Sequence, residues 1–541
     1  MNFKNESLLG WPIYPLLFAI YIPLNLFAHN LSLYSANDIL RSIIFLPLLV
    51  GLLLALLSIV FRRPNFAALI TVLLVGYGVY FYSGTTRDIP LVAGLLIICG
   101  LAYKLNIGTR ATRVFNLLAV AVVAQPLVII ATESISIASI STLADSPFNE
   151  PIPRHALEKA TPPTIVHIVL DGYGSNETLR NLFEHDNTPF SNELTEMGFI
   201  VGQDVRTPYN QTLLVMTSIF NGTYLEPGRG PLSVKTSDHL RGVLGKLTTQ
   251  GPLYQRLSEM GYSFLFVEPG YEFLGRPAEV IISAPDIPAE RINYFEQELL
   301  NFLFRLTPLH RLESVEIYKN IYLQNALTTE FYRSAKGPYL LYEHIIAPHP
   351  PFVIDRNGND TDRWEKFNTL ATGNHATYGL PHLAEEYQEG YREKLLFTND
   401  GIVKQLRRMI RDIPGPKIIL LHGDHGSGSF YYHEYPEFSC LSERYNTFLA
   451  VYADDPAVRD KFATLASERF NLVNIYRLIF DASFGTELGP LEDKSFFARW
   501  STPQTPIPLP EQELARDCPT MTLYRDDSDA ELAEHLEEEA H

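Results

Sequence analysis

Residues 418–430, IILLHGDHGSGSF, place an aspartate and a histidine directly after a run of apolar residues. The apolar run is typical of a buried strand, and the glycines would suffice for a turn, so neither explains Asp424 and His425. A second apolar run, TIVHIVL at 164–170, likewise leads straight into Asp171. Two carboxylates and a neutral imidazole are oxygen and nitrogen ligands that suit one divalent ion, zinc or manganese. The sequence therefore predicts a metal site with Asp171, Asp424 and His425 as ligands.

A threonine is the candidate nucleophile and the fourth ligand. The stretch 207–222, TPYNQTLLVMTSIFNG, predicts a loop and then an apolar helix from about 213 that ends at Asn221-Gly222. Thr212 would cap this helix, where free N–H groups and the helix dipole favour an alkoxide or a phosphate. A threonine hydroxyl is a weak nucleophile, and a metal ion would activate it and polarise a phosphoryl oxygen. Taken alone, Thr212 is more often only a capping residue.

Strand-like and helix-like segments alternate after residue 160. Five apolar runs are separated by longer amphipathic or polar segments such as 387–412; the runs are TIVHIVL, SFLFVE, YLLYEHII, KIILLH and TFLAVYA. This alternation predicts an α/β domain in which helices cover a mostly parallel central sheet. Ligands of such sheets bind beyond the carboxyl ends of the strands, and that is where Asp171 and 424–425 would meet.

The first 135 residues are poor in charge and rich in apolar residues. Five stretches each offer roughly 17 to 20 mainly apolar residues, about enough to cross a bilayer; they are 11–31, 43–61, 66–82, 89–105 and 115–132. So many apolar stretches in a row are rare in water-soluble folds, and they do not fit a single cleaved signal peptide. The sequence therefore predicts an N-terminal α-helical transmembrane bundle of about five spans.

The basic residues predict the orientation of this bundle. With a cytoplasmic N-terminus, six of them lie inside, namely Lys4, Arg62, Arg63, Lys104, Arg110 and Arg113. Only Arg41 and Arg87 then lie in outside loops. An odd number of spans places everything after about residue 135 on the extracytoplasmic side.

Four regions follow from these patterns. They are a transmembrane domain at 1–135, a linker without fixed structure at 136–160, a catalytic domain at 161–500, and a Pro-rich stretch with an acidic, disordered tail at 501–541. Eight of the last 16 residues are acidic and none is basic, which is typical of a solvated tail.

Charge and cysteine content limit the partners and add one open question. Beyond residue 150 the chain has 35 basic and 55 acidic residues and no basic stripe with interleaved aromatic residues, which argues against nucleic acid as a binding partner.

Of the three cysteines, Cys99 lies in a predicted span. Cys440 and Cys518 would be able to pair in an oxidising compartment, but their spacing does not decide whether they do.

Four motifs, in this order, resemble the sulfatase branch of the alkaline phosphatase superfamily: IVHIVLDGYG, the Thr212 stretch, IIAPHPPFVID and LLHGDHGSG. With the spans ahead of them, they are similar to the membrane-anchored lipoteichoic acid synthases and phosphoethanolamine transferases of bacteria. The resemblance implies an alkaline phosphatase-like fold and a location in a bacterial-type inner (plasma) membrane. It implies Thr212 as the nucleophile and Asp171, Thr212, Asp424 and His425 as ligands of one Zn or Mn ion. His349, within APHPPF, would face the phosphate or sulfate group of the substrate.

Departures from the family pattern narrow the reaction. A hydrolytic sulfatase carries a C/S-x-P-x-R motif at the nucleophile, whereas residues 212–216 are Thr-Leu-Leu-Val-Met, which disfavours sulfate ester hydrolysis. Asp171 stands where the membrane transferases usually have glutamate. No complete second set of metal ligands is identified, although five residues lie in suitable loops: Asp355, Asp360, Asp362, His344 and His375.

Other polar residues have simpler explanations. His344 and His422 lie on or next to strands, where a structural histidine is the better interpretation. Arg444 would be able to touch substrate, but an ion pair is the more common role for such a residue.

Three functions remain open from the sequence. In the first, Thr212 attacks a phospholipid head group of phosphoethanolamine or phosphoglycerol type, and an envelope glycan or lipid then accepts the group. In the second, water resolves the same intermediate and the enzyme is a phosphodiesterase or phosphatase. In the third, the domain is a catalytically silent sensor or scaffold. The expected partners are the lipid bilayer, a head-group donor and an envelope acceptor.

Overall fold

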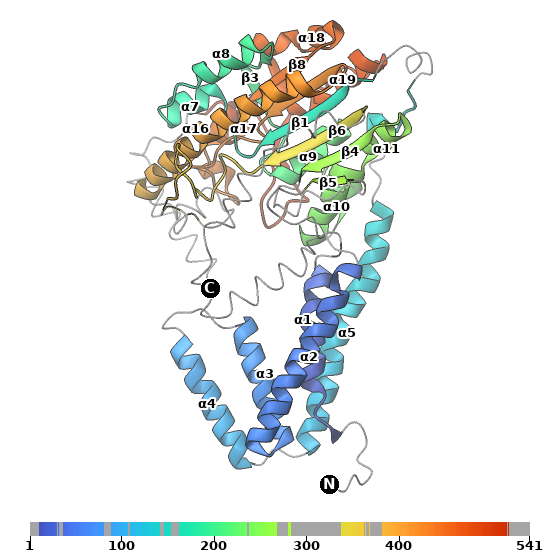
Figure 1. Ribbon diagram of the computed structural model, residues 1–541, viewed down its shortest axis with the longest axis vertical. Helices are drawn as coiled ribbons and strands as arrows, with labels where there is room; N and C mark the ends of the chain where they lie inside the picture. Colours follow the sequence, from blue (N-terminus) through green and yellow to red (C-terminus); the bar gives the residue numbers. More distant parts are fainter. Residues whose placement is uncertain are drawn as a thin grey trace. The chain divides into compact units, whose positions relative to one another are not determined.

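The computed structural model describes two compact units, a helical unit up to Ser139 and a larger unit from Ile140 onward (Figure 1). The residues it describes are 10–29, 31, 36–80, 88–105, 109–140, 145–152, 162–234, 237–267, 280–282, 337–361, 363, 367, 381–516 and 518.

The helical unit has a helix in each stretch predicted as a span. The helices are α1 (Tyr14–His29), α2 (Ala36–Phe61), α3 (Pro64–Tyr80), α4 (Asp88–Leu105) and α5 (Thr109–Ile140). Within the described residues, two segments are long and apolar enough to cross a membrane, Ile39–Phe61 and Arg110–Thr132. The apolar parts of the other three helices are shorter. The prediction of about five spans is therefore supported for two segments only.

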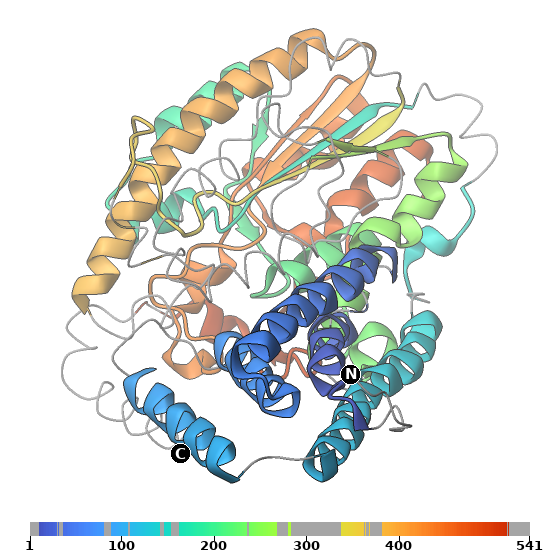
Figure 2. The same cartoon turned by 60° about the horizontal axis from the view of Figure 1, so that its bottom comes forward.

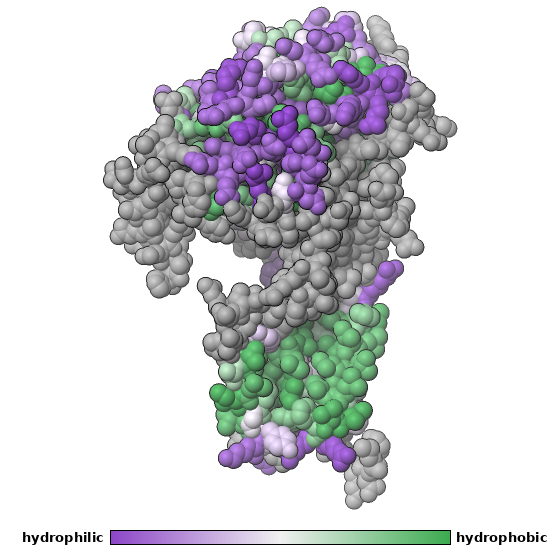
Figure 3. Space-filling model, turned by 60° about the vertical axis from the view of Figure 1, so that its left-hand side comes forward, coloured by the Kyte–Doolittle hydropathy of each residue, from purple (hydrophilic) through white to green (hydrophobic). Residues whose placement is uncertain are grey.

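The side chains of these two segments point away from the protein interior. Only 11% of each segment's most apolar window is buried, and Leu48 and Ile59 are 67% and 74% exposed. On the face in Figure 3, the surface of the helical unit is mostly hydrophobic and that of the larger unit mostly hydrophilic. The core helix of a soluble protein would bury such side chains, so this surface is suited to lipid.

The larger unit is built on a seven-stranded sheet with the order β2-β8-β7-β1-β6-β4-β5. Its strands are β1 (Thr164–Leu170), β2 (Ile200–Val201), β4 (Ser263–Val267), β5 (Val280–Ile282), β6 (Tyr339–Ile345), β7 (Lys417–His422) and β8 (Leu449–Ala453). Only β8 runs antiparallel to its neighbours β7 and β2. All five predicted strands are present, and the predicted α/β fold with a mostly parallel sheet is confirmed.

Helices cover both faces of this sheet (Figures 1 and 2). The described α-helices of this unit are α7 (Asn176–Leu182), α8 (Thr188–Glu196), α9 (Thr212–Asn221), α10 (Ser237–Gln250), α11 (Pro252–Glu259), α16 (Pro381–Asp412), α17 (Leu441–Tyr445), α18 (Pro456–Phe462), α19 (Ile475–Phe484) and α20 (Glu511–Leu514). Two small sheets pair β3 (Asp204–Arg206) with β9 (Arg469–Asn471) and β10 (Ser495–Phe497) with β11 (Ile507–Leu509).

The central strand β1 contacts a different helical layer with each of its two faces. Ile168 belongs to the same buried core as Leu406 of α16, whereas His167 stacks on Phe220 of α9 and lies beside Tyr476 of α19. All seven side chains of β1 are buried. Burying one Val, Leu or Ile side chain stabilises a fold by about 1.5 to 3 kcal/mol, which explains why this strand is almost wholly apolar.

One sequence expectation about the flanking segments, a linker without fixed structure, is not met within the described residues. Helix α5 runs to Ile140, into the predicted linker, and the turn Pro147–Asn149 is anchored by Phe148, which is 2% exposed and packs on Phe480. The Pro-rich stretch is joined to the rest of the unit: its strand β11 pairs with β10, and Glu511 of α20 forms an ion pair with Arg206. The acidic tail from 519 lies outside the described residues.

Candidate active site

Two neighbouring strand ends carry the acidic residues of the site. Strands β1 and β7 are parallel and paired, so their carboxyl ends lie side by side. Asp171 follows β1 immediately, and Asp424 follows β7 after one glycine. Gly172, with a φ of +71°, turns the chain so that its N–H donates to Asp424 Oδ1 at 3.0 Å. The sheet therefore holds the two carboxylates next to each other.

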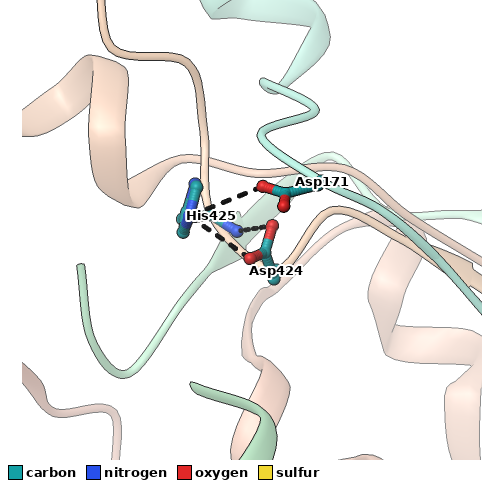
Figure 4. A group of neighbouring side chains, drawn as sticks. All are labelled: Asp171, Asp424 and His425. Carbon is teal, nitrogen blue, oxygen red and sulfur yellow. Dashed lines mark hydrogen bonds and ion pairs between the residues drawn. The ribbon is translucent and has the colours of Figure 1, made fainter. Parts of the chain in front are cut away.

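Asp171, Asp424 and His425 form a compact, buried group (Figure 4). One ligand atom from each residue lies within 4.8 Å of the others. His425 Nε2 is 3.2 Å from Asp424 Oδ2 and 3.8 Å from Asp171 Oδ1. Asp171 Oδ1 and Asp424 Oδ2 are buried and accept no hydrogen bond from any described residue. Two such oxygens facing one another are costly to bury unless a cation pairs with them.

The hydrogen bonds of His425 define which of its nitrogens faces the site. His425 Nδ1 lies 2.9 Å from the Gly426 carbonyl oxygen, which can only accept, so Nδ1 carries the proton. Burial, followed by the charge of Arg444, lowers the pKa of His425 well below its usual value, so the ring is neutral. Nε2 therefore carries the lone pair of the ring and lies near both carboxylates, with Arg444 Nη2 2.9 Å away, and a ring nitrogen of this kind suits a metal ligand oriented by a backbone carbonyl.

The two carboxyl groups have pKa values shifted in opposite directions. Burial, together with the negative charge of Asp171, raises the pKa of Asp424. Burial also opposes ionisation of Asp171, but His349 and His344 beside it outweigh this effect and lower its pKa. Two carboxylates and one neutral imidazole fit a zinc or manganese ion, whose charge would relieve the repulsion between the acids.

Thr212 joins this group from the other side of the site. It is the first residue of α9, and its Oγ1 lies 3.3 Å from His425 Nε2. The prediction that Thr212 caps the helix is wrong, because Gln211 occupies the cap position. The predicted helix end at Gly222 is confirmed, with a left-handed φ of 58°. Thr212 is only partly buried, in contrast to Asp171, Asp424 and His425.

His349 lies beside the group in a loop that is tightly held. Its N–H donates to the Asp171 carbonyl at 3.1 Å, and its Nδ1 donates to the Pro350 carbonyl at 2.8 Å. This leaves Nε2 unprotonated, since burial lowers the pKa of His349. The buried Lys394 of α16 donates to the carbonyls of Ile346, His349 and Pro351, so one cation holds the whole turn.

Arg444 and Glu443 belong to the site as well; sequence reasoning weighed a substrate contact for Arg444 but favoured an ion pair, and it gave Glu443 no role. Arg444 Nη2 lies 2.9 Å from His425 Nε2, and its guanidinium also donates to the Asn210 carbonyl at 2.8 and 3.0 Å. Arg444 is 3% exposed and forms no ion pair with a described acid, so the expected ion pair is absent.

Glu443 accepts hydrogen bonds from the loop that follows His425, at Ser427, Ser429 and Phe430. Gly426 is required here, because a Cβ would collide with the Glu443 carbonyl.

Two histidines on strands β6 and β7 hold residues of the site or residues next to it. His344 Nε2 lies 3.4 Å from Asp171 Oδ2, so this histidine positions an acid of the site. His422 Nδ1 donates to the Gly423 carbonyl, and His422 Nε2 lies 2.6 Å from His167 Nε2. His167 must then donate from Nε2 and accept from the Tyr476 hydroxyl at Nδ1, 2.8 Å away. The sequence signal for these roles was weak, since buried strand histidines are usually structural.

The candidate second set of metal ligands does not assemble among the described residues. The one described group of three or more potential ligands is Asp171, Asp424 and His425. Asp355 instead accepts hydrogen bonds from Asn357 and Asn359 in an exposed turn. Asp362 and His375 lie outside the described residues.

The chain is similar in structure to several enzymes, although no protein-family profile and no curated protein matches its sequence. One is the C-terminal periplasmic domain of EcEptC from Escherichia coli, with 11% identity, 67% of this chain and 98% of that chain covered, and a TM-score of 0.41. Another is the lipooligosaccharide phosphoethanolamine transferase EptA from Neisseria meningitidis, with 13% identity, 86% and 79% coverage, and a TM-score of 0.37. The phosphonate monoester hydrolase of Agrobacterium radiobacter has 10% identity, 62% and 80% coverage, and a TM-score of 0.33. These similarities are distant, and no function is assigned from them.

Proposed function

We propose that this chain is a membrane-anchored, metal-dependent phosphotransferase. It would move a phospholipid head group, of phosphoethanolamine or phosphoglycerol type, to an envelope glycan or lipid. The observation that supports this proposal is the position of the Thr212 hydroxyl, 3.3 Å from His425 in a group with two buried acids. The basic-residue pattern supports several spans, a cytoplasmic N-terminus and an extracytoplasmic catalytic domain.

The proposed reaction has two displacement steps at phosphorus. In the first, Thr212 Oγ1 loses its proton and bonds to the phosphorus, while the bond from phosphorus to the diacylglycerol oxygen breaks and diacylglycerol leaves with a proton. In the second, an acceptor hydroxyl loses its proton and bonds to the phosphorus, and the Thr212 hydroxyl is restored. A divalent ion held by Asp171, Thr212, Asp424 and His425 would lower the pKa of the Thr212 hydroxyl and neutralise charge on the phosphoryl group.

Three fixed features of the chain suit the charge of a phosphoryl group. Helix α9 begins at Thr212, so its free N–H groups point toward the same region. The buried guanidinium of Arg444 lies next to His425 and brings a positive charge without a described acidic partner. His349, held by Pro350 and Lys394, would donate to a phosphoryl oxygen once its Nε2 takes up a proton. Such preorganised groups act without reorganisation during the reaction.

The test is to trap the covalent intermediate. The full chain in lipid nanodiscs would be incubated with phosphatidylethanolamine or phosphatidylglycerol labelled in the head group, with Zn²⁺ or Mn²⁺, and its intact mass measured. We expect one head-group phosphoryl adduct, mapped to Thr212 by peptide analysis. Thr212→Ala should remove the adduct, and Thr212→Ser, which keeps a hydroxyl, should retain it.

The same experiment separates the alternatives. Release of the free phosphorylated head group without transfer to an added acceptor would identify a hydrolase instead. No bound metal, no adduct and no released head group would contradict both enzymatic functions and favour a silent scaffold.

A further inference from the structure

Trp500 is an unusual residue on the surface of the larger unit. Its side chain is 44% exposed, and among the described residues from 140 onward no other large hydrophobic side chain is exposed. A single exposed apolar residue needs no explanation by itself. Its fixed conformation, and the hydrogen bonds that join its segment to the residue before Thr212, suggest a function.

The Trp500 backbone and ring are both held in place. Trp500 N–H donates to the His433 carbonyl at 3.3 Å, and both oxygens of the Glu434 carboxylate accept from Ser501, at 2.9 and 2.7 Å. The Arg241 guanidinium carbon lies 4.2 Å from the centre of the ring, and the His433 ring is edge-on at 5.5 Å. An exposed ring that is already ordered loses little entropy when a ligand stacks on it.

The segment that carries Trp500 is bonded to the residues that precede the nucleophile. Gln211 Nε2 and Asn210 Nδ2 both donate to the Ala498 carbonyl, at 2.7 and 2.9 Å. Trp500 follows Ala498 by two residues, a separation of at most about 7 Å. Gln211 is directly before Thr212. The ring is therefore carried by a segment that is bonded directly to the residue preceding the candidate nucleophile.

The groups around the Trp500 ring indicate which chemical class of ligand would bind there. A cationic group is disfavoured, because Arg241 already lies over the ring. An acyl chain or an apolar protein surface would need several exposed apolar side chains, and the described part of this unit exposes only Trp500. A sugar ring has a flat C–H face that can stack on the indole of Trp500. Its hydroxyl groups can donate to the Glu434 carboxylate and accept from the Arg241 guanidinium.

We propose that Trp500, Arg241, His433 and Glu434 form a subsite for a sugar ring of the acceptor. This inference rests on the proposed phosphotransferase function and names the chemical class of its second substrate. The subsite would hold the sugar so that one of its hydroxyl groups reaches the phosphoryl group on Thr212.

Sugar binding can be measured without any reaction. The tryptophan emission of the full chain in nanodiscs would be titrated with oligosaccharides of glucose, mannose and N-acetylglucosamine, each free in solution and each linked to a lipid in the disc. We expect a saturable change with at least one sugar in the wild type and in Trp11→Ala, and none in Trp500→Ala. A response to free and lipid-linked forms points to a glycan acceptor, and a response to the lipid-linked form alone points to a glycolipid. No saturable change with any of the six ligands would overturn the proposal, even if the Thr212 adduct forms.

The kinetic test distinguishes a subsite from a structural role. With the sugar that binds, Trp500→Ala should raise the acceptor KM about tenfold, whereas Trp500→Phe, which keeps a flat ring, should raise it less. Formation of the Thr212 adduct in the absence of acceptor should still occur in both variants. Equal losses in adduct formation and in transfer would instead show that Trp500 only supports the fold. Failure of the adduct in the wild type would contradict the proposed function but not a measured sugar-binding site.

Discussion

Arg444 Nη2 lies 2.9 Å from His425 Nε2, although the two residues come from different elements, α17 and the loop after β7. The guanidinium also lies 4.5 Å from the centre of the Tyr431 ring and donates to the Asn210 carbonyl, so its position is fixed. A buried cation beside a candidate metal ligand is expected to attract the anionic part of a substrate.

We expect Arg444→Met to slow formation of the Thr212 adduct by about 10² to 10³, the usual loss when one stabilising donor is removed. Arg444→Lys should lose less, since it keeps the charge but not the forked hydrogen bonds to Asn210. Single-turnover mass spectrometry would give the rates. A parallel measurement of bound metal should show no change, and a matching loss of metal would mean that Arg444 acts only through the ligand cluster.

Metal binding should depend on the three clustered residues. Asp424→Asn and His425→Ala are each expected to lower the affinity for Zn²⁺ or Mn²⁺ at least tenfold, because each removes one of the ligands. Equilibrium dialysis with elemental analysis of the full chain would measure this. Asp355→Asn is the matched control, because this acid lies in an exposed turn outside the cluster. Unchanged affinity in both cluster variants would contradict the predicted site.

The hydrogen-bond chain from Tyr476 through His167 to His422 should stabilise the larger unit. Tyr476→Phe removes the donor to His167 Nδ1, which would then be buried without a partner. Leaving a buried acceptor unsatisfied costs about 1 to 3 kcal/mol, so thermal unfolding should shift to a clearly lower temperature. Tyr452→Phe, whose hydroxyl bonds to Asp454 in a partly buried position, should have a smaller effect. Similar shifts in unfolding temperature for both variants would argue against a special role of the hydrogen bonds that link Tyr476, His167 and His422.

Glu343 should make the stability of the fold dependent on pH. Burial raises the pKa of this carboxyl to about 8, against a small opposing effect of its hydrogen bond from Gln405. Between the usual pKa of 4.5, which applies to the unfolded chain, and the folded-state pKa of about 8, the folded state binds more protons than the unfolded chain. The stability of the wild type is therefore highest below about pH 4.5 and falls toward about pH 8. Glu343→Gln should remove this decline and be more stable than the wild type at pH 8, by about 1 to 4 kcal/mol. Thermal unfolding at pH 5, 6.5 and 8 would test this, and parallel curves for the two proteins would contradict it.

Several features of the fold were predictable because they depend on short segments. The runs 164–170 and 417–422 are apolar at most of their positions, and both are buried strands of a mostly parallel sheet. The carboxyl-end rule then placed Asp171 next to 424–425 without coordinates. The apolar run ended by Gly222 was correctly predicted as a helix, because a glycine in the left-handed region is a local signal.

Other predictions failed where a tertiary contact decided the outcome. The linker was expected to lack fixed structure, but Phe148 packs against Phe480, more than 300 residues away. The Cys440–Cys518 pairing could not be decided from spacing, and the structure shows this disulfide. Thr212 was expected to cap its helix, but the cap lies one residue earlier, and the hydroxyl faces His425.

The sequence by itself determined which residues can do chemistry and at which strand and helix ends they lie, because apolar periodicity and helix-ending signals act over a few neighbours. Only the tertiary structure decided which residues complete the site. Arg444 and His344 reach it through the strand order and through hydrogen bonds to distant segments, and nothing in their immediate neighbours encodes those contacts. The free energy of such contacts comes from burying groups that meet only after the chain has folded, so it leaves no local pattern to detect.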